Sequence, residues 1–203
     1  MSYPDFLGKS LTEIENDLRW KGLVKTTGDL NSDGVDDHAV VLESRDSIPE
    51  KRCSDCNLLK SKPRIIIVLI NRDGKQMVEI QNNRFIGRGN EGGMLPYLEP
   101  ELFIHNEMLT ICYQFTRSKI SYVFKYSDDT MVLVKAKSGG VHSASGDFEQ
   151  TSFDFKKGEI ISETGNISNI KIQKERIKTN IKSKTLSEFG PMMEWEVIEN
   201  KFL

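Results

Sequence analysis

The chain has 203 residues and a formal net charge of −2, with 37% hydrophobic and 29% charged residues. This composition supports one folded domain over residues 1–203, and the near-neutral charge provides no general attraction to nucleic acid or to a membrane surface. The longest apolar run, residues 65–70, is far shorter than the roughly 18–20 residues that a membrane span needs. We therefore expect no membrane span and no nucleic-acid partner.

The first predicted element is a helix that begins after Ser10. Ser10 and Glu13 have the spacing of a capping box, in which each side chain bonds the backbone of the other residue. Ile14 and Leu18 then follow at helical spacing. We predict that the helix ends near Trp20.

Strands dominate the rest of the chain. β-Branched and aromatic residues, alternating with polar ones or in short apolar runs, predict strands at 22–27, 38–44, 64–70, 76–82, 101–106, 108–115, 119–126, 131–137, 147–155 and 159–165. Asp73-Gly74 and Asn106-Glu107 are typical of tight hairpin turns. The predicted fold class is α+β, mainly β, with antiparallel hairpins in a twisted sheet or sandwich.

The C-terminal part of the chain changes character. Residues 169–185 are rich in lysine, and we expect a solvated, partly extended segment; the alternative is a basic patch that meets an acidic partner. Nucleic acid is not expected there because no aromatic side chains interleave with the charges. Residues 186–203 carry aromatic and methionine side chains, so we expect this segment to dock on the body of the domain.

The most informative motif is the acidic loop "GDLNSDGVDD" at residues 28–37. Counted from its first aspartate, it places oxygen groups at alternate positions, namely Asp29, Asn31, Asp33, the carbonyl of Val35, and Asp37. Alternate residues of a tight loop point the same way, and Ca²⁺ binds about six to eight oxygen ligands. Without a cation the carboxylates would repel one another. We therefore predict a Ca²⁺ site in this loop.

Other interpretations of the acidic loop are weaker. An EF-hand needs a glutamate at the twelfth position, which is Val40 here, so the loop is not an EF-hand. An Asx-rich hairpin loop without an ion remains the alternative.

Cys53 and Cys56 form a C-x-x-C pair in a polar loop between two strands. A thioredoxin-type pair opens a helix, and a zinc site normally needs a second pair of ligands, so both are disfavoured. We predict a structural disulfide, which would require an oxidising compartment; two free thiols are the alternative.

Two segments resemble catalytic motifs but lack their context. Residues 87–92 match G-x-G-x-x-G, yet glycine and proline follow at once instead of the helix that would bind a phosphate. Residues 142–147 bring histidine, serine and aspartate into one polar loop, whereas catalytic triads converge from distant segments. We assign no catalytic residues and expect that the protein is not an enzyme.

The pattern D-x-N-x-D-G-x-x-D between two strands resembles the calcium loops of integrin-type (FG-GAP-like) propeller repeats and of related bacterial secreted proteins. It occurs once, whereas a propeller needs several copies. The order of features also resembles an uncharacterised family of bacterial exported proteins and lipoproteins, through residues 28–43, "PRIIIVLINRDGK", "EGGM", "TSFDFKKGEII" and "LSEF". The resemblance implies an exported, β-rich fold with a calcium loop, and no established activity.

The calcium loop and the cysteine pair together favour a periplasmic or secreted protein whose leader, with any lipid anchor, has been removed; a cytoplasmic protein is the alternative. We predict a non-enzymatic binding protein, in its most specific form a periplasmic immunity or inhibitor protein that blocks a toxin or a cell-wall hydrolase. The alternatives are a hydrolase of cell-envelope polymers with unidentified carboxylates, and a structural envelope protein. The residues predicted to contact the protein partner are Arg88, Asn90, Glu91, Tyr97, His142, Lys174 and Arg176.

Overall fold

A computed structural model describes residues 3–52, 56–169 and 171–203. One short helix, α1 (Leu11–Glu15), precedes the strands. The smaller main sheet contains β1 (Trp20–Gly28), β2 (Asp37–Ser44), β5 (Arg64–Arg72) and β6 (Lys75–Asn82). The larger one contains β7 (Pro100–His105), β8 (Met108–Gln114), β9 (Ser118–Ser127), β10 (Thr130–Val141), β11 (Asp147–Asp154), β12 (Glu159–Asn166) and β13 (Gln173–Lys178). Short elements complete the fold: β3 (Ile48–Glu50), β4 (Leu59–Ser61), β14 (Glu196–Ile198), β15 (Lys201–Phe202) and the 3₁₀ turns η1 (Gly89–Glu91) and η2 (Leu186–Glu188).

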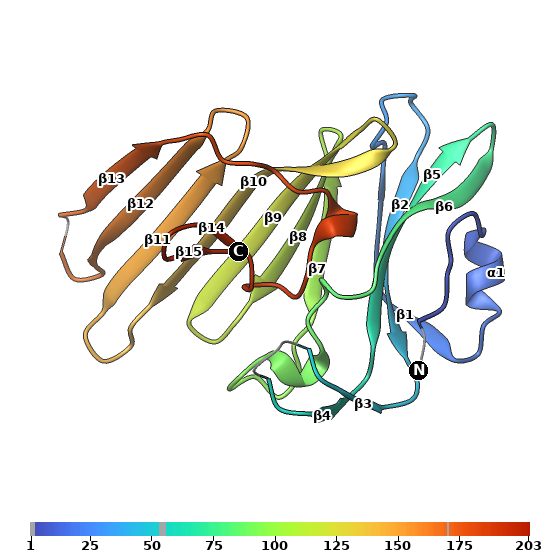
Figure 1. Ribbon diagram of the computed structural model, residues 1–203, viewed down its shortest axis with the longest axis horizontal. Helices are drawn as coiled ribbons and strands as arrows, with labels where there is room; N and C mark the ends of the chain where they lie inside the picture. Colours follow the sequence, from blue (N-terminus) through green and yellow to red (C-terminus); the bar gives the residue numbers. More distant parts are fainter. Residues whose placement is uncertain (1–2, 53–55, 170) are drawn as a thin grey trace.

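Both main sheets are antiparallel. The smaller has the order β1-β2-β5-β6, and the larger runs β13-β12-β11-β10-β9-β8-β7, so that each of its strands pairs with its neighbours in sequence. Figure 1 shows the larger sheet face-on and the smaller one nearly edge-on beside it. The predicted class, α+β and mainly β with antiparallel hairpins, is confirmed.

The hairpin turns have the left-handed backbone that tight turns between twisted strands require. Asp73 and Gly74 have φ values of 53° and 78°, and Asn106 and Glu107 have 49° and 60°. Asparagine, aspartate and glycine tolerate this region best. The short polar pairs therefore set the register of the hairpins that they connect.

The main core lies between the two sheets. One face of β2, β5 and β6 packs against one face of the larger sheet, which contributes large side chains such as Tyr122 and Phe124. We call this the inner face of the larger sheet and the opposite one its outer face. The other face of the smaller sheet packs under α1 and the N-terminal segment, through residues that include Phe6 and Ile14. The molecule is thus built in three layers.

The helix is shorter than predicted. It ends at Glu15, and Leu18 is 81% exposed because the chain has already turned toward β1. The N–H of Trp20 donates to the carbonyl of Asp17 at 3.0 Å, and the indole packs edge-on against Phe6 at 6.1 Å between ring centroids. Trp20 therefore begins a strand, and the helical spacing of Leu18 is coincidental.

The C-terminal segment closes the main core. Phe189 and Leu203 are buried in it, next to the aromatic side chains of the larger sheet. The side-chain amide of Asn82 donates to the carbonyls of Leu186 and Phe189 at 2.7 and 2.9 Å. A buried asparagine at the end of β6 thus holds a segment that lies about a hundred residues further along the chain.

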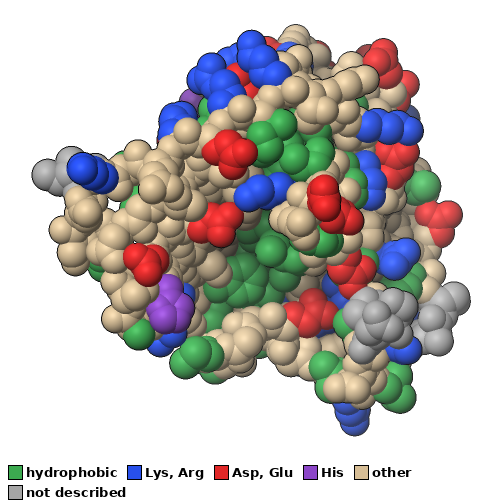
Figure 2. Space-filling model, turned by 60° about the vertical axis from the view of Figure 1, so that its left-hand side comes forward, with side chains coloured by type: hydrophobic (Ala, Val, Ile, Leu, Met, Phe, Trp, Pro, Cys, Tyr) green, Lys and Arg blue, Asp and Glu red, His purple; other side chains and the backbone are tan. Residues whose placement is uncertain are grey.

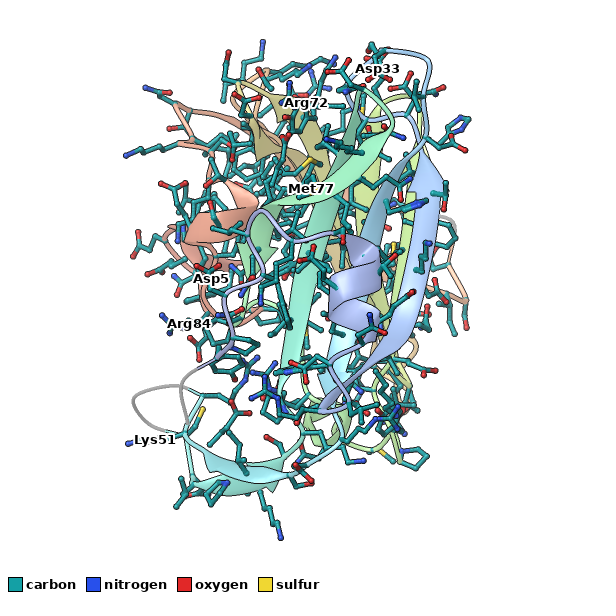
Figure 3. The ribbon with its side chains drawn as sticks, turned by 90° about the vertical axis from the view of Figure 1, so that its right-hand side faces the viewer. Asp5, Asp33, Lys51, Arg72, Met77 and Arg84 are labelled. Carbon is teal, nitrogen blue, oxygen red and sulfur yellow. The ribbon has the colours of Figure 1, made fainter. Side chains whose placement is uncertain are left out.

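The lateral edges of the two main sheets differ in what covers them. Lys9 and its neighbours cover the edge of β6, where the N–H of Gly8 donates to the carbonyl of Val78 at 2.9 Å; Figure 3 shows this segment running past Met77. The edges β1 and β7 lie against each other so closely that a Cβ at Gly28 would lie 2.6 Å from Cγ2 of Ile104. The remaining edge, β13, is at the far end of the larger sheet (Figure 1).

Candidate functional site

A groove with a volume of about 1390 Å³ lies on the inner face of the larger sheet. It occupies the end of the sheet where β10 leads into the loop before β11 and where β12 leads toward β13. Figure 2 shows this side of the molecule hollowed, with hydrophobic side chains in the hollow and charged side chains of both signs around it.

Where β10, β11 and β12 pass under the groove, its floor is made of small polar residues. Along β10 the inner face changes from the buried Leu133 and Ala136 to Ser138 and Gly140. Ser138 is paired with Thr151 on β11, and the next strand adds Thr164. Since these side chains are short, they fill little of the space above the sheet, and the concave face stays open there.

Exposed apolar side chains border this polar floor. Val141 and Ile172 line the groove from the ends of β10 and the segment before β13, and Met193 lines it from the C-terminal segment with 49% of its surface exposed. Met193 also has a φ of 68°, a left-handed conformation that is costly for a residue other than glycine. Methionine adapts its shape to varied partners, so this position suits a contact surface.

The polar groups at the rim bond to one another. Asp147 accepts a hydrogen bond from the side-chain amide of Asn166 at 2.8 Å, and His142 lies 3.1 Å from the Ser145 hydroxyl. The hydrogen bonds of Ser145 and Asn166 lower the pKa of Asp147, so this carboxylate stays ionised at neutral pH. Glu149 forms an ion pair with Lys201 at 3.2 Å. The predicted contact residue His142 thus lies beside a groove lined with paired charges.

The acidic loop is organised by its own backbone. The Asp29 carboxylate accepts hydrogen bonds from the N–H groups of Ser32 and Gly34 at 2.7 and 2.9 Å. Asp33 accepts one from the N–H of Val35 at 2.8 Å and one from the side-chain amide of Asn31 at 2.9 Å. The carboxylates therefore sit inside the turn, at the end of the molecule where Figure 3 labels Asp33.

Asp37 has a different position from the other members of the loop. It is fully buried, and its two carboxylate oxygens accept the N–H groups of Leu30 and Asn71 at 2.8 Å each. Burial raises the pKa of Asp37, while the two backbone N–H groups act in the opposite direction. In the described part of the chain, no three Asp, Glu, His or Cys side chains gather into a metal-binding group. The Ca²⁺ site stays a prediction.

Only part of the loop 87–99, which holds four of the predicted contact residues, is exposed. Arg88 is fully buried, and its guanidinium forms an ion pair with Glu50 at 2.9 Å and donates to the carbonyls of Arg64 and Ile86. The expectation that Arg88 contacts a partner is corrected, because the residue holds the base of this loop inside the protein. Glu91, also expected at the surface, forms an ion pair with Arg52 at 2.8 Å and is only partly exposed.

Further along the same loop, Asn90 and Tyr97 are exposed, but both are also bonded. Asn90 donates to the carbonyl of Lys60 at 3.3 Å. The Tyr97 hydroxyl donates to Glu43, and its ring lies 4.9 Å from the guanidinium carbon of Arg64. Tyr97 therefore closes a buried ion pair from the solvent side.

The buried ion pair that Tyr97 covers joins Glu43 and Arg64, and the sequence did not predict it. Glu43 and Arg64 sit in apolar strands next to each other, are almost completely buried, and approach to 2.9 Å. Burial alone would raise the pKa of Glu43, but hydrogen bonds from Tyr97, Lys21 and Arg64 outweigh it and lower the pKa. A charged residue at the end of each of two strongly apolar strands was the only signal.

Lys174 and Arg176 lie on β13 and are more than half exposed. Lys174 forms an ion pair with Glu163 at 2.8 Å, and Arg176 one with Glu159 at 3.4 Å, both across to β12. The sequence predicted only a partly extended segment here, whereas residues 173–178 form a regular strand.

The predicted disulfide falls partly on Cys53, which lies outside the described residues, so the pairing of Cys53 with Cys56 stays a prediction. Cys112 is a buried free thiol on β8, and burial raises its pKa. This is consistent with a packing role for Cys112.

Comparisons of this chain with protein-family models, with curated proteins and with solved structures found no match. The structure has no helix, within the residues it describes, that is long and apolar enough to cross a membrane. The resemblance to exported calcium-loop proteins therefore stays a prediction from sequence.

Proposed function

We propose that this protein is a non-enzymatic binding protein that receives a segment of a protein partner in the groove of the larger sheet. The observation that carries the proposal is the groove itself, which combines a polar floor with exposed apolar residues at its border. The exposed Met193, held in a left-handed backbone conformation, adds an adaptable contact. In its most specific form the protein is a periplasmic immunity or inhibitor protein that blocks a toxin or a cell-wall hydrolase.

The chemistry of the groove supports binding over hydrolysis. A glycosidase needs a carboxyl group that holds its proton near neutral pH beside a second, ionised one. The pKa of Asp147 is lowered instead, by hydrogen bonds from Ser145 and Asn166, and Glu149 is paired with Lys201. These groups serve better as polar contacts than as an acid and a base.

Filling the groove tests this proposal. Thr164→Trp on β12 would place a large side chain in the groove, and Ser152→Trp on β11 would place the same side chain on the outer face. The immobilised wild type and both variants are exposed to envelope and secreted proteins of the source organism. We expect a stoichiometric toxin or hydrolase, inactive when bound, on the wild type and on Ser152→Trp only. Equal capture by all three proteins contradicts the groove as the binding site.

We further propose that the acidic loop binds Ca²⁺ and stabilises the fold. Support comes from Asp29 and Asp33, whose carboxylates both accept backbone N–H groups of the same turn. An ion that binds only the folded state raises the melting temperature as its concentration rises. The test compares melting in Ca²⁺ and in chelator for the wild type and for Asp29→Ala with Asp33→Ala. We expect a calcium-dependent rise in the wild type alone; identical melting of the wild type in both solutions contradicts the site.

A further inference from the structure

The two main sheets have four lateral edges, and three of them are covered. The N-terminal segment around Lys9 bonds to β6, and β1 and β7 lie against each other. β13 forms the fourth edge, and within the described ranges no other strand pairs with its far side. An open edge at the end of a seven-stranded sheet offers a row of backbone donors and acceptors to an incoming strand.

The hydrogen-bond pattern identifies which residues offer these groups. The N–H of Thr179 donates to the carbonyl of Gly158 at 2.9 Å, next to the pairing of Lys178 with Glu159. Bonded and non-bonded pairs alternate in an antiparallel ladder, so Ile177 and the residues at 175 and 173 bond to β12. The N–H and C=O groups of Lys174, Arg176 and Lys178 therefore point away from the sheet, toward solvent.

The same three residues carry the positive charge of the strand. Since side chains alternate between the faces of a sheet, Lys174, Arg176 and Lys178 all lie on the outer face, at a spacing of about 7 Å. On the inner face, Ile177 packs against the core. Gln173 and Glu175 share the inner face with it and are exposed. An added strand would thus meet cations at every second residue on one face, and an apolar neighbour at Ile177 on the other.

We propose that the open edge of β13 binds an extended acidic segment of a partner protein as an eighth strand of the larger sheet. The segment carries aspartate or glutamate at alternate positions, opposite the three cations, with β-branched residues between them. Its backbone bonds to the outward groups of β13, and its acidic side chains compete with Glu159 and Glu163 for Arg176 and Lys174. This surface is distinct from the groove, and the proposal does not depend on the proposed function.

A protein strand fits this edge better than nucleic acid. Residues 171–178 contain no aromatic side chain on which bases could stack. The cations also repeat at the period of a strand and coincide with the free backbone groups, which a phosphate backbone does not require. An oligonucleotide therefore serves as one arm of the test.

The test uses a labelled alternating peptide, acetyl-Thr-Glu-Val-Glu-Val-Glu-Thr-amide. Two peptides of the same length serve as controls. One has lysine in place of each glutamate, and the other has the same composition with its three glutamates next to one another. Binding to the full chain is followed by fluorescence anisotropy. We expect the alternating acidic peptide to bind and to be weakened by salt. Lys174→Gln and Lys178→Gln should each reduce the affinity by up to about fivefold. Glu163→Gln, which releases Lys174, should increase it.

A proline substitution separates backbone pairing from simple charge attraction. Arg176→Ala removes the side chain, and Arg176→Pro removes in addition the N–H that points to solvent, which an edge strand tolerates. We expect the proline variant to bind the acidic peptide more weakly than the alanine variant while melting at a similar temperature. Hydrogen exchange of the 174, 176 and 178 amides should slow when the peptide binds.

Three results would overturn the proposal. One is no binding of the alternating acidic peptide at millimolar concentration, which leaves the lysines only as protection against aggregation at an edge. Another is equal affinity of the alanine and proline variants, or of the alternating and clustered peptides, which indicates non-specific charge attraction. The last is tighter binding of a single-stranded oligonucleotide, insensitive to the proline.

Discussion

The two ends of the seven-stranded sheet differ in what surrounds them. At the β7 end, β1 of the other sheet lies against the edge, and nearby Glu43 and Arg64 form an ion pair that is almost completely buried. At the β13 end, Lys174 forms an ion pair with Glu163, and the lysine side chain is 52% exposed. Loss of one partner should therefore destabilise the fold strongly at Glu43–Arg64 and only slightly at Lys174–Glu163, because solvent screens the exposed pair and not the buried one.

Replacing the arginine at each end gives the largest predicted effect. Arg64→Met leaves the buried Glu43 with the partly exposed Lys21 as its remaining cationic partner, and we expect a loss of about 3–5 kcal/mol in the free energy of unfolding. Arg176→Met should change it little, since the arginine side chain is 57% exposed and solvent screens its pair with Glu159. Urea unfolding measures both. The double variant Glu43→Gln with Arg64→Met should recover much of the loss. A failure to recover would assign the cost to packing or to the carbonyls of Gly87 and Leu98, to which Arg64 also donates at 2.7 Å each.

The close contact between the sheets should be almost as sensitive. Gly28→Val places a side chain where Ile104 lies, and we expect a loss of about 1–3 kcal/mol from overpacking. Gly22→Val in the same strand meets open space and serves as the control. Adding Ile104→Ala to Gly28→Val should restore stability in part. Equal stability of the two valine variants would show that the sheets separate easily at this edge.

The N-terminal segment that covers the edge of β6 is followed by the capping box of α1, which we expect to contribute less to stability than the two contacts above. The Ser10 hydroxyl accepts the N–H of Glu13 at 3.3 Å, and the Glu13 carboxylate accepts the N–H of Ser10 at 2.8 Å. We expect Ser10→Ala to cost about 1 kcal/mol and to speed hydrogen exchange at the Val78 amide beneath it. Thr12→Ala, at an exposed position of the same helix, should do neither.

The buried ion pair should also contribute to the acid sensitivity of the protein. The pKa of Glu43 in the folded protein lies below its ordinary value of 4.5, mainly because hydrogen bonds from Tyr97, Lys21 and Arg64 outweigh burial. Its contribution to stability is therefore complete above pH 4.5 and is lost as the pH falls through the lowered pKa. Urea midpoints between pH 7 and 3 should decline less steeply in the double variant Glu43→Gln with Arg64→Met. Parallel declines would assign the acid sensitivity to other carboxylates.

The sequence predicted those parts of the fold that are decided locally. β-Branched runs such as 64–70 and turn pairs such as Asp73-Gly74 identified strands and hairpins, because β-propensity and left-handed turn residues act within a few positions. The helix end was misjudged at Leu18, where spacing alone could not show that the chain turns away. Arg88 was misjudged because its burial depends on Glu50, which approaches from a different hairpin.

The candidate groove was harder to predict than the strands. Small polar residues at Ser138, Thr151 and Thr164 look unremarkable in separate strands and form one floor only once the register aligns them. His142 was identified because it lies in a polar loop, but Met193 was not, since its role depends on how the C-terminal segment docks. The role of such residues depends on neighbours that are distant in sequence. Predicting it requires the strand register, which short-range sequence patterns do not contain.

The buried amide of Asn82 has a consequence for the order in which the molecule forms. The strands of the larger sheet pair with their sequence neighbours, so each hairpin closes only a short loop of chain. The bonds from Asn82 to Leu186 and Phe189 close a loop of about a hundred residues and need β6 in place first. Contacts of such sequence separation form slowly. We therefore expect refolding in which the hairpins gain protection early and the C-terminal segment docks last, as the step that seals the core.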